Sequence, residues 1–301
     1  VKRSIDLLRP IVAAQLISVL NSQVLAMDET PIKAGKAGKG KMSKGWFWPL
    51  YGDQDEIVFT FSKSRGRQQI ENTLKQDFKG TLISDGYAAY TSYIEKNKEI
   101  THAQCWVHSR RKFIEAETEY PDRVKEALAM IATLYKEEER IEAQGLDETS
   151  KRERRLEKSK PVVDRFFEWC QQQLNLGDLL PSSPLRKALN YVISRETELR
   201  VFLEEPNVPL DTNHLERALR PIPMGRKNWL FCWTEVGAEH VGIIQSLICT
   251  CKQHKINPYT YLTDVLLRIN QHPASQVEEL TPRLWKEKFA ENPLRSDLAS
   301  Q

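Results

Sequence analysis

The chain has 301 residues, 40% hydrophobic and 28% charged, which is enough for a real core in one large domain or two smaller ones. The net charge is only +3, so the molecule is not a polycation, and any nucleic-acid role must come from local basic patches. Five scattered cysteines exclude a disulfide framework and favour a reducing cytoplasm, and no apolar run of about 18 residues predicts a membrane span.

The N-terminal third predicts alternating helices and strands. Helical spacing of apolar residues predicts one core-facing helix over 4–23, and the apolar run after it predicts a buried strand that ends at Asp28. The Lys- and Gly-rich stretch 33–45 reads as a mobile basic loop or part of a hairpin. The aromatic stretch 45–52, with Pro49 suggesting an edge or bulge, and the alternating stretch 57–61 predict an antiparallel meander.

A second set of elements follows in the order helix, strand, helix, strand. The pattern predicts a helix over 66–78, a buried strand over 80–84 that ends at Asp85, a helix over 87–95 and a short strand over 99–106. Together these elements predict an α/β domain with a mixed sheet flanked by helices.

The remainder of the chain predicts helices. We expect the first part of the α/β domain at 1–112, an all-helical insertion at 113–205, the remainder of the domain at 206–237 and a C-terminal helical segment at 238–301. Helices are expected at about 238–254 and 258–270, and the polar last 20 or so residues are expected to fray.

The two strand-end aspartates, Asp28 and Asp85, are the first candidates for a site. Carboxylates at neighbouring strand ends repel unless a cation lies between them, and a divalent metal is the usual solution. A single strand that ends in Asp is common, however, and often marks only the junction with a loop.

Glu216 is a third candidate with a simple structural explanation. Asn213 and Glu216 have the spacing of a capping box, and Glu216 can pair with Arg220 one turn later. The residues alone therefore do not assign Glu216 to catalysis.

Five motifs in a fixed order change this interpretation. They are MDETP at 27–31, SDGY at 84–87, CWVHSRRKF at 105–113, ERALRP at 216–221 and GRKNWLF at 225–231. With these motifs the chain resembles transposases of the insertion sequence 66 family over roughly residues 10 to 280, including the tail segments 246–248 and 264–269.

The resemblance implies a ribonuclease-H-like fold with a DDE triad, which falls on Asp28, Asp85 and Glu216. The same three residues are then the metal ligands for two Mg²⁺ ions, with Mn²⁺ as a substitute. The helical insertion accounts for the long separation of Asp85 from Glu216 in the chain.

The implied reaction is attack on a phosphodiester by water and then by a DNA 3′-hydroxyl. Two Mg²⁺ ions about 3.5–4 Å apart stabilise the attacking and leaving oxygens, and carboxylates are suitable ligands. We expect Asp28 to bridge the ions. Ser84 precedes Asp85 but has no obvious partner base in the sequence, so serine catalysis is not favoured.

Cys105 and His108 allow three interpretations. They have the spacing of half a zinc site, which Cys249, Cys251 and His254 could complete. They resemble motifs that support the active site in DDE enzymes, which is the role we assign. A packing cysteine and a hydrogen-bonded histidine remain the simple alternative.

Basic clusters beside aromatic residues are candidates for DNA contact, although short basic runs are often only solvated surface. The Lys- and Gly-rich stretch is the best of them, because glycine lets it follow a duplex. The candidates are Lys33, Lys36, Lys39, Lys41, Lys44, Arg110, Arg111, Lys112, Arg217, Arg220, Arg226 and Lys227.

The expected partners are the DNA ends of a mobile element and its target, a second copy of the chain in the DNA complex, and helper proteins encoded by the element. Bound chain would then lie on the bacterial nucleoid. Only 27 residues precede Asp28, and the resemblance implies a further N-terminal region for end recognition. We therefore expect this chain alone to bind DNA weakly and with little sequence preference.

Three other functions compete with a transposase. A metal-dependent nuclease on the same fold would cut without joining, a truncated remnant would only bind DNA, and a structural or assembly protein would do neither. The intact acids argue against the remnant, although the lack of a clear start residue or of an upstream DNA-binding module favours it. The basic stretch and the ordered motifs argue against a structural or assembly protein.

Overall fold

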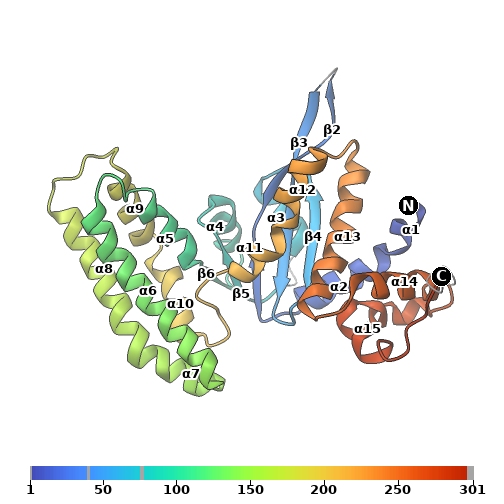
Figure 1. Cartoon of the computed structure of the whole chain (residues 1–301). Coiled ribbons are helices and arrows are strands. Elements are labelled where there is room, and N and C mark those ends of the chain that lie inside the picture. The colour runs from blue at the N-terminus through green and yellow to red at the C-terminus, as the bar shows by residue number, and fades with distance from the viewer. Residues whose placement is uncertain (1, 39–40, 75–77, 297–301) are drawn as a thin grey trace. The chain divides into compact units, whose positions relative to one another are not determined.

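The computed structural model describes the chain apart from residues 1, 39–40, 75–77 and 297–301 (Figure 1). As predicted, it is a mixed α/β protein with a mixed sheet and many helices. Contacts divide the chain into two compact units, which we describe separately. The sheet unit comprises Val1–Gly80, Glu95–Ile100 and His214–Gln301, and the helical unit comprises Thr81–Ile94 and Thr101–Asn213. The domain boundaries inferred from the sequence remain predictions.

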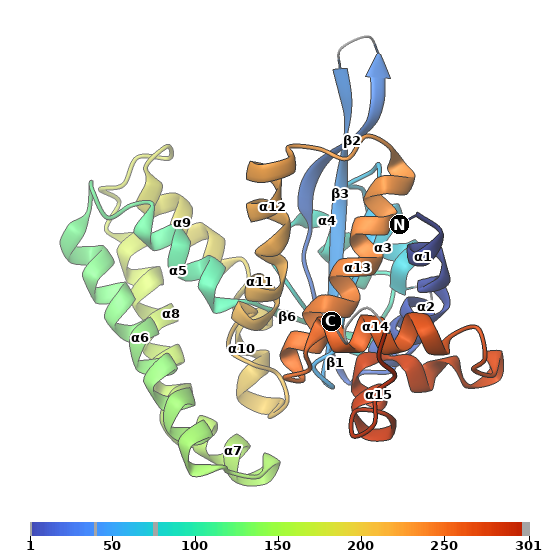
Figure 2. The same ribbon diagram turned by 45° about the vertical axis from the view of Figure 1, so that its right-hand side comes forward.

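The sheet unit is built around one long strand. β3 (Lys41–Gly52) pairs antiparallel with β4 (Ile57–Ser62) on one edge and, in succession, with β2 (Thr30–Gly38) and β1 (Val24–Met27) on the other. The predicted meander is confirmed. The basic stretch is an extended β2–β3 hairpin rather than a loop, and Figure 2 shows it projecting beyond the rest of this unit.

Pro49 lies inside β3, not at a sheet edge. It falls opposite Asp28, where β1 has ended and β2 has not begun, and its carbonyl accepts a hydrogen bond from the Asp28 N–H at 3.4 Å. Proline has no N–H to return that bond. The ladder is therefore interrupted at Asp28, and a proline is tolerated in a central strand.

The N-terminal helix predicted over 4–23 is two helices, α1 (Lys2–Leu7) and α2 (Arg9–Leu20). Pro10 lies in the first turn of α2, where no N–H is needed, but inside a continuous helix its ring would clash with the carbonyl one turn earlier. The prediction of a single helix was wrong for that reason.

The outer edge of β4 is covered by α13 (Glu235–Gln253). Ser246 and Thr250 of this helix accept hydrogen bonds from the N–H groups of Phe59 and Ile57, at 2.9 and 3.1 Å. Four residues of helix rise about 6.0 Å and two residues of strand about 6.6 Å, so the two spacings match. The helix thereby satisfies backbone groups that an edge strand otherwise exposes.

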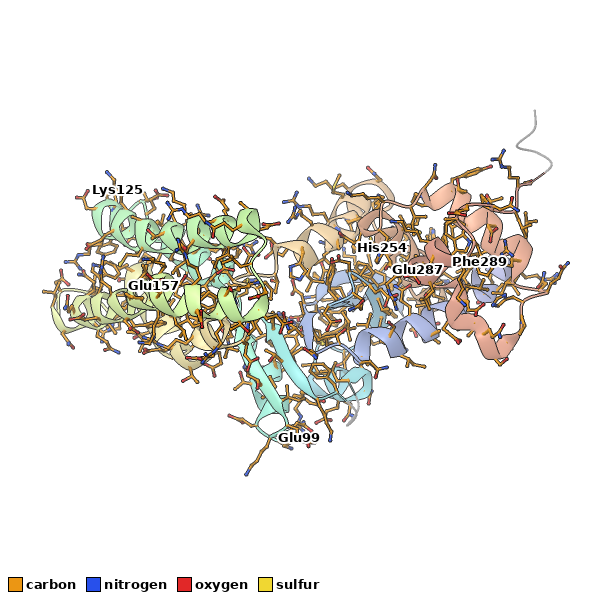
Figure 3. All side chains as sticks on the ribbon, turned by 90° about the horizontal axis from the view of Figure 1, so that it is seen from below. Glu99, Lys125, Glu157, His254, Glu287 and Phe289 are labelled. Atoms are coloured by element: carbon orange, nitrogen blue, oxygen red, sulfur yellow. The ribbon has the colours of Figure 1, made fainter. Side chains whose placement is uncertain are left out.

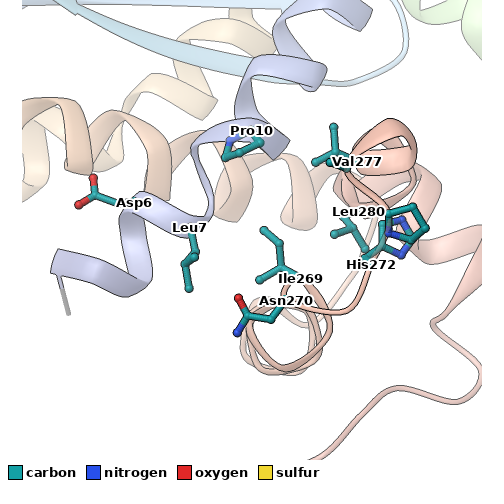
Figure 4. A pocket seen from close by; sticks show the side chains of 10 residues that line it. Asp6, Leu7, Pro10, Ile269, Asn270, His272, Val277 and Leu280 are labelled. Atoms are coloured by element: carbon teal, nitrogen blue, oxygen red, sulfur yellow. The ribbon is translucent and has the colours of Figure 1, made fainter.

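The chain end is ordered rather than frayed over its described part. After α14 (Pro258–Arg268) come the 3₁₀ segment Ala274–Leu280 and α15 (Pro282–Lys288), in which Leu280 and Trp285 are buried. Val277 and Leu280 line a cavity of 260 Å³ beside α1 and α2, and their side chains are labelled in Figure 4. The polar composition was misleading because a few large apolar residues anchor this segment.

The remaining elements of the sheet unit are helices. They are α3 (Arg67–Leu74), α11 (Asn213–Leu219), whose first residue belongs to the other unit, and α12 (Pro221–Trp229).

The helical unit begins with β5 (Gly80–Ser84), α4 (Ala88–Ile94) and β6 (Ile100–Gln104), although the first residue of each strand belongs to the sheet unit. Charged residues such as Lys125 and Glu157 lie exposed on the helices that follow (Figure 3). These helices are α5 (Trp106–Ile114), α6 (Pro121–Gln144), α7 (Glu148–Arg154), the π-helical turn Arg155–Ser159, α8 (Lys160–Asn175), α9 (Pro184–Ile193) and α10 (Glu196–Glu204).

Candidate active site

Asp28 directly follows β1, whose residues Leu25, Ala26 and Met27 are buried. The Asp28 side chain is half-buried, and its Oδ1 accepts a hydrogen bond from the Glu29 N–H at 2.7 Å. The Glu29 carboxylate is in turn bound by the Arg65 guanidinium at 2.6 and 2.8 Å. The first predicted acid thus has a fixed backbone and one oriented carboxylate oxygen.

Glu216 lies on α11 in the same unit. Leu215, Ala218 and Leu219 are buried, which fixes the orientation of the helix. The ring of His214 packs edge-on against Tyr51 at 4.6 Å, and Tyr51 pairs in register with Ala26 of β1. This contact anchors α11 to the strand beside β1, so two of the three predicted acids belong to the sheet unit.

Asp85 follows β5, whose residues Leu82 and Ile83 are buried. Its Oδ1 accepts a hydrogen bond from the Tyr87 N–H at 2.9 Å, which forms a turn just before α4. Like Asp28, it is half-buried and has one oxygen oriented by a nearby backbone N–H. It lies in the helical unit.

Gly86 shows why the second motif contains a glycine. A Cβ at Gly86 would lie 2.7 Å from the Tyr191 hydroxyl and from Nε of Arg195. Arg195 donates a hydrogen bond to the Gly86 carbonyl at 3.1 Å and stacks on the Tyr191 ring at 4.1 Å. Sequence reasoning missed Tyr191 and Arg195, because nothing in the chain order relates them to Asp85.

The structure supplies the partner that Ser84 lacks in the sequence. Its Oγ lies 2.9 Å from Nε2 of His102, on β6. Burial, together with the nearby Arg195, lowers the pKa of His102 to about 4, so the imidazole is neutral near pH 7. Ser84 itself is 1% exposed, which leaves no access for a large substrate.

Cys105 is a buried hydrogen-bond acceptor. Its Sγ accepts from the N–H and the hydroxyl of Thr212, both at 3.3 Å, and the Trp106 N–H donates to the Leu210 carbonyl. Burial raises the pKa of its thiol. The cysteine therefore holds the segment that leads into α11. A supporting role for His108, which is half-buried on α5, stays a prediction.

The alternative zinc residues lie in α13 or at its end. Cys249 and Cys251 are buried there, and Cys249 donates a weak hydrogen bond to the Ala218 carbonyl. His254 ends the helix, and its carbonyl accepts from Lys286 (Figure 3). Across the described residues, no three His, Cys, Asp or Glu side chains form a ready metal site.

Four of the five predicted lysines are exposed on the β2–β3 hairpin, namely Lys33, Lys36, Lys41 and Lys44, and Lys39 lies outside the described residues. Lys33 and Lys44 are directly opposite each other in register. Like charges in that position destabilise a strand pair, and the Lys44 ammonium also lies over the Trp46 ring, 5.2 Å from its centroid.

The other predicted cations are divided between the units. In the helical unit, Arg110 and Arg111 are exposed on α5, and Lys112 pairs with Glu115 at 2.8 Å. In the sheet unit, Arg217, Arg220 and Lys227 are exposed, and Arg226 donates a hydrogen bond to the Pro31 carbonyl beside the hairpin.

Comparisons with known proteins identify the family. The model described as "Transposase IS66 family" matches residues 1–240, and the model of the "IS66 C-terminal element" matches residues 246–283. The chain belongs to the IS66 transposase family. The resemblance of the motifs is therefore confirmed.

Three relatives from Sinorhizobium fredii (strain NBRC 101917 / NGR234) are similar to this IS66 family member. "Uncharacterized protein y4qI" is 32% identical over 86% of this chain and 50% of its own length. "Uncharacterized protein y4hP" is 29% identical over 90% and 52%, and "Uncharacterized protein y4jD" is 28% identical over 93% and 57%. The chain spans about half the length of the curated relatives it matches.

The IS66 models cover the principal features of the site. The first spans both units and includes all three predicted acids, and the second begins inside α13 at Ser246, the residue that accepts from β4.

A membrane-spanning helix is not found among the described residues, because no helix there combines sufficient length with sufficient apolar character.

Proposed function

We propose that this chain is the catalytic portion of a DNA transposase with a ribonuclease-H-like core. In this proposal it hydrolyses a phosphodiester at the end of a mobile element and then transfers the freed 3′-hydroxyl to target DNA. Asp28, Asp85 and Glu216 are the catalytic acids. Binding to the bacterial nucleoid, a dimer in the DNA complex and helper proteins are further expectations of the same proposal.

One observation carries the proposal. In a chain matched to a transposase family over residues 1–240, Asp28 and Asp85 each follow a buried strand, and each has one carboxylate oxygen oriented by a local backbone N–H. Catalytic groups require this kind of preorganised support. The contact of His214 with Tyr51 supports the inclusion of Glu216.

The donor set suits Mg²⁺. All three residues are half-buried, and their carboxylates offer the hard oxygen ligands that this ion prefers. When bound, two such ions would supply charge stabilisation to the attacking and leaving oxygens. The chain's own residues orient the carboxylates and, through the cations of the hairpin, hold the DNA backbone.

Cleavage and joining of labelled element ends with Mg²⁺ or Mn²⁺ is the direct test. Asp28→Asn, Asp85→Asn and Glu216→Gln should each abolish both steps without loss of folding, because the amides keep the shape but not the charge. Glu126→Gln, an exposed acid on α6, is the matched control. Near-normal cleavage by any of the three variants would remove that residue from the site.

Divalent metal offers a readout that does not depend on activity. Metal should raise the melting temperature of the wild type by mass action, and the rise should be much smaller in Asp28→Asn. Equal shifts in the two proteins would place the ion elsewhere. Cleavage without joining would instead favour the metal-dependent nuclease, and DNA binding without cleavage would favour the truncated remnant.

A further inference from the structure

A cavity of 490 Å³ lies beside the β2–β3 hairpin, within the sheet unit. Its lining combines three cations with apolar side chains. The cations are Lys33, Lys44 and Arg226, and the apolar side chains include Ile32, Met42 and Phe231. The volume is within the range of small-molecule sites, roughly 300–1,000 Å³.

The charges of this cavity are all of one sign. Lys33 and Lys44 face each other across the strands in direct register, and Arg226 is held nearby by its hydrogen bond to the Pro31 carbonyl. No carboxylate is among the described residues that line the cavity, so none of them balances the charge of the three cations. An anionic ligand would relieve the repulsion between the opposed lysines.

The apolar wall of the cavity, which Leu230 and Phe231 form, is held in place by backbone pairing of the next residue, Cys232. Cys232 forms a parallel bridge with Ala34 of β2, with its N–H bonded to the Lys33 carbonyl at 2.8 Å and its carbonyl to the Gly35 N–H at 3.2 Å. Cys232 is buried, whereas Phe231 and Trp233 on either side of it are not, and their rings meet edge-on at 5.0 Å.

Leu230, which also lines the cavity, adds a sign of local strain. It has a φ of 60°, which leucine rarely adopts, and it is 63% exposed. Strained backbone of this kind persists where the surroundings enforce it and is concentrated at binding and catalytic sites. An exposed, strained leucine beside three cations is consistent with a ligand that contacts the wall.

We propose that this cavity binds an unpaired nucleotide at the end of a DNA strand, with its phosphate between the cations and its base against Phe231. The inference rests on the proposed function for the class of ligand, and charge complementarity selects an anion with a flat apolar part. Bases stack on aromatic rings without strict sequence preference. Duplex DNA alone would use the lysines but not the wall.

The test compares two DNA probes that differ only in a four-nucleotide single-stranded overhang. Titrations are carried out with the full chain in EDTA at fixed salt, so that catalysis does not contribute. The wild type should bind the overhang probe about tenfold more tightly than the blunt probe, a difference of about 1.4 kcal/mol. A 2-aminopurine in the overhang should lose fluorescence on binding.

Phe231→Ala should remove the preference and the fluorescence change but leave blunt-duplex affinity unaltered. Phe231→Leu keeps apolar volume without the flat ring and should lose most of the preference, and melting curves establish that both variants fold. Tyr259→Ala, an aromatic side chain that is 69% exposed on α14, is the matched control and should keep the preference. The double variant Lys33→Ala, Lys44→Ala should lower the salt slope for both probes by roughly two.

Each outcome has a distinct meaning. Equal binding of the two probes by the wild type, or an unchanged preference in both Phe231 variants, would overturn the inference. Cleavage and joining could still succeed in either case, so the proposed function would stand. Failure of the chain to bind either probe would overturn both.

Discussion

Among the described residues, the most deeply buried charged side chain is a cation in the helical unit and an anion in the sheet unit. In the helical unit, Arg155 is fully buried and donates to the carbonyls of Phe202, Glu205 and Pro206 at 2.6–3.3 Å, with Glu138 as its ion-pair partner. In the sheet unit, Asp264 is fully buried and accepts from Arg268, Trp285 and the Leu294 N–H at 2.6–2.9 Å.

The difference in sign is explained by the buried polar groups that each unit leaves without a partner in its helices and strands. The chain leaves α10 through carbonyls that have no helical partner, and a guanidinium supplies several donors to them. The C-terminal segment instead leaves an N–H and an indole N–H inside, and a carboxylate accepts from both. For Arg155 and Asp264, the sign of the buried charge thus follows from the groups that it satisfies.

The largest expected effect is loss of the buried cation. Arg155→Ala should destabilise the helical unit by about 3–5 kcal/mol, because the Glu138 carboxylate and the carbonyls of Phe202 and Pro206 lose this buried donor. Chemical denaturation measures the change. Arg152→Ala, which removes an ion pair about half exposed on both sides, is the control and should cost less than about 1 kcal/mol. Equal losses would mean that burial of Arg155 does not matter.

Replacement of the buried Asp264 carboxylate should have a smaller effect on stability. Burial acts to raise the pKa of Asp264, but hydrogen bonds from Arg268, Trp285 and Leu294 outweigh it, so the pKa is below its ordinary value. Asp264→Asn should cost about 2–3 kcal/mol at pH 7. Because stabilisation by a depressed carboxyl is lost as pH falls below about 4, the difference from wild type should shrink there. Glu287→Gln, an exposed acid on α15, should show no such difference (Figure 3).

His102 tests whether the helical unit tolerates a cation at a half-buried position near Arg195. Its pKa is lowered to about 4, first by burial and then by Arg195, so the unfolded chain binds a proton there at a higher pH than the folded one. Stability should therefore fall as pH drops from about 6.5 to 4, by about 2 kcal/mol. His102→Gln should abolish this part of the pH dependence. A pH profile identical to that of the wild type would contradict the assignment.

The smallest expected effect on stability comes from Ser246, whose side chain is neutral. In Ser246→Ala the Phe59 N–H loses its acceptor and the Gly242 carbonyl loses a donor. The variant should lose about 1–2 kcal/mol of stability. Ser275→Ala, at an exposed position of the 3₁₀ segment, should be close to neutral. A loss as large as that of Arg155→Ala would mean that neutral hydrogen bonds at the sheet edge contribute as much as the buried ion pair.

The sequence predicted elements well where periodicity was strong. The buried strands that end before Asp28 and Asp85, and the helices on either side of residue 257, follow from apolar runs and capping residues that act locally. The prediction failed where one or two residues override the pattern of their neighbours. Pro10 split a helix, and Leu280 and Trp285 anchored a tail whose composition is polar.

The candidate acids could be found from motifs, but their surroundings could not. Chain order does not relate Ser84 to His102, Gly86 to Arg195, or Lys33 to the residues around Cys232. Each of these contacts joins segments that only strand pairing or helix packing brings together.

The sequence by itself determined the class of fold, the family and the residue types available for chemistry, because these depend on local patterns and ordered motifs. Tertiary structure decided which backbone groups remain unpaired inside each unit, and therefore where a buried charge is required and of which sign. It also decided that two lysines oppose each other on one hairpin, because register is a property of the folded strand pair.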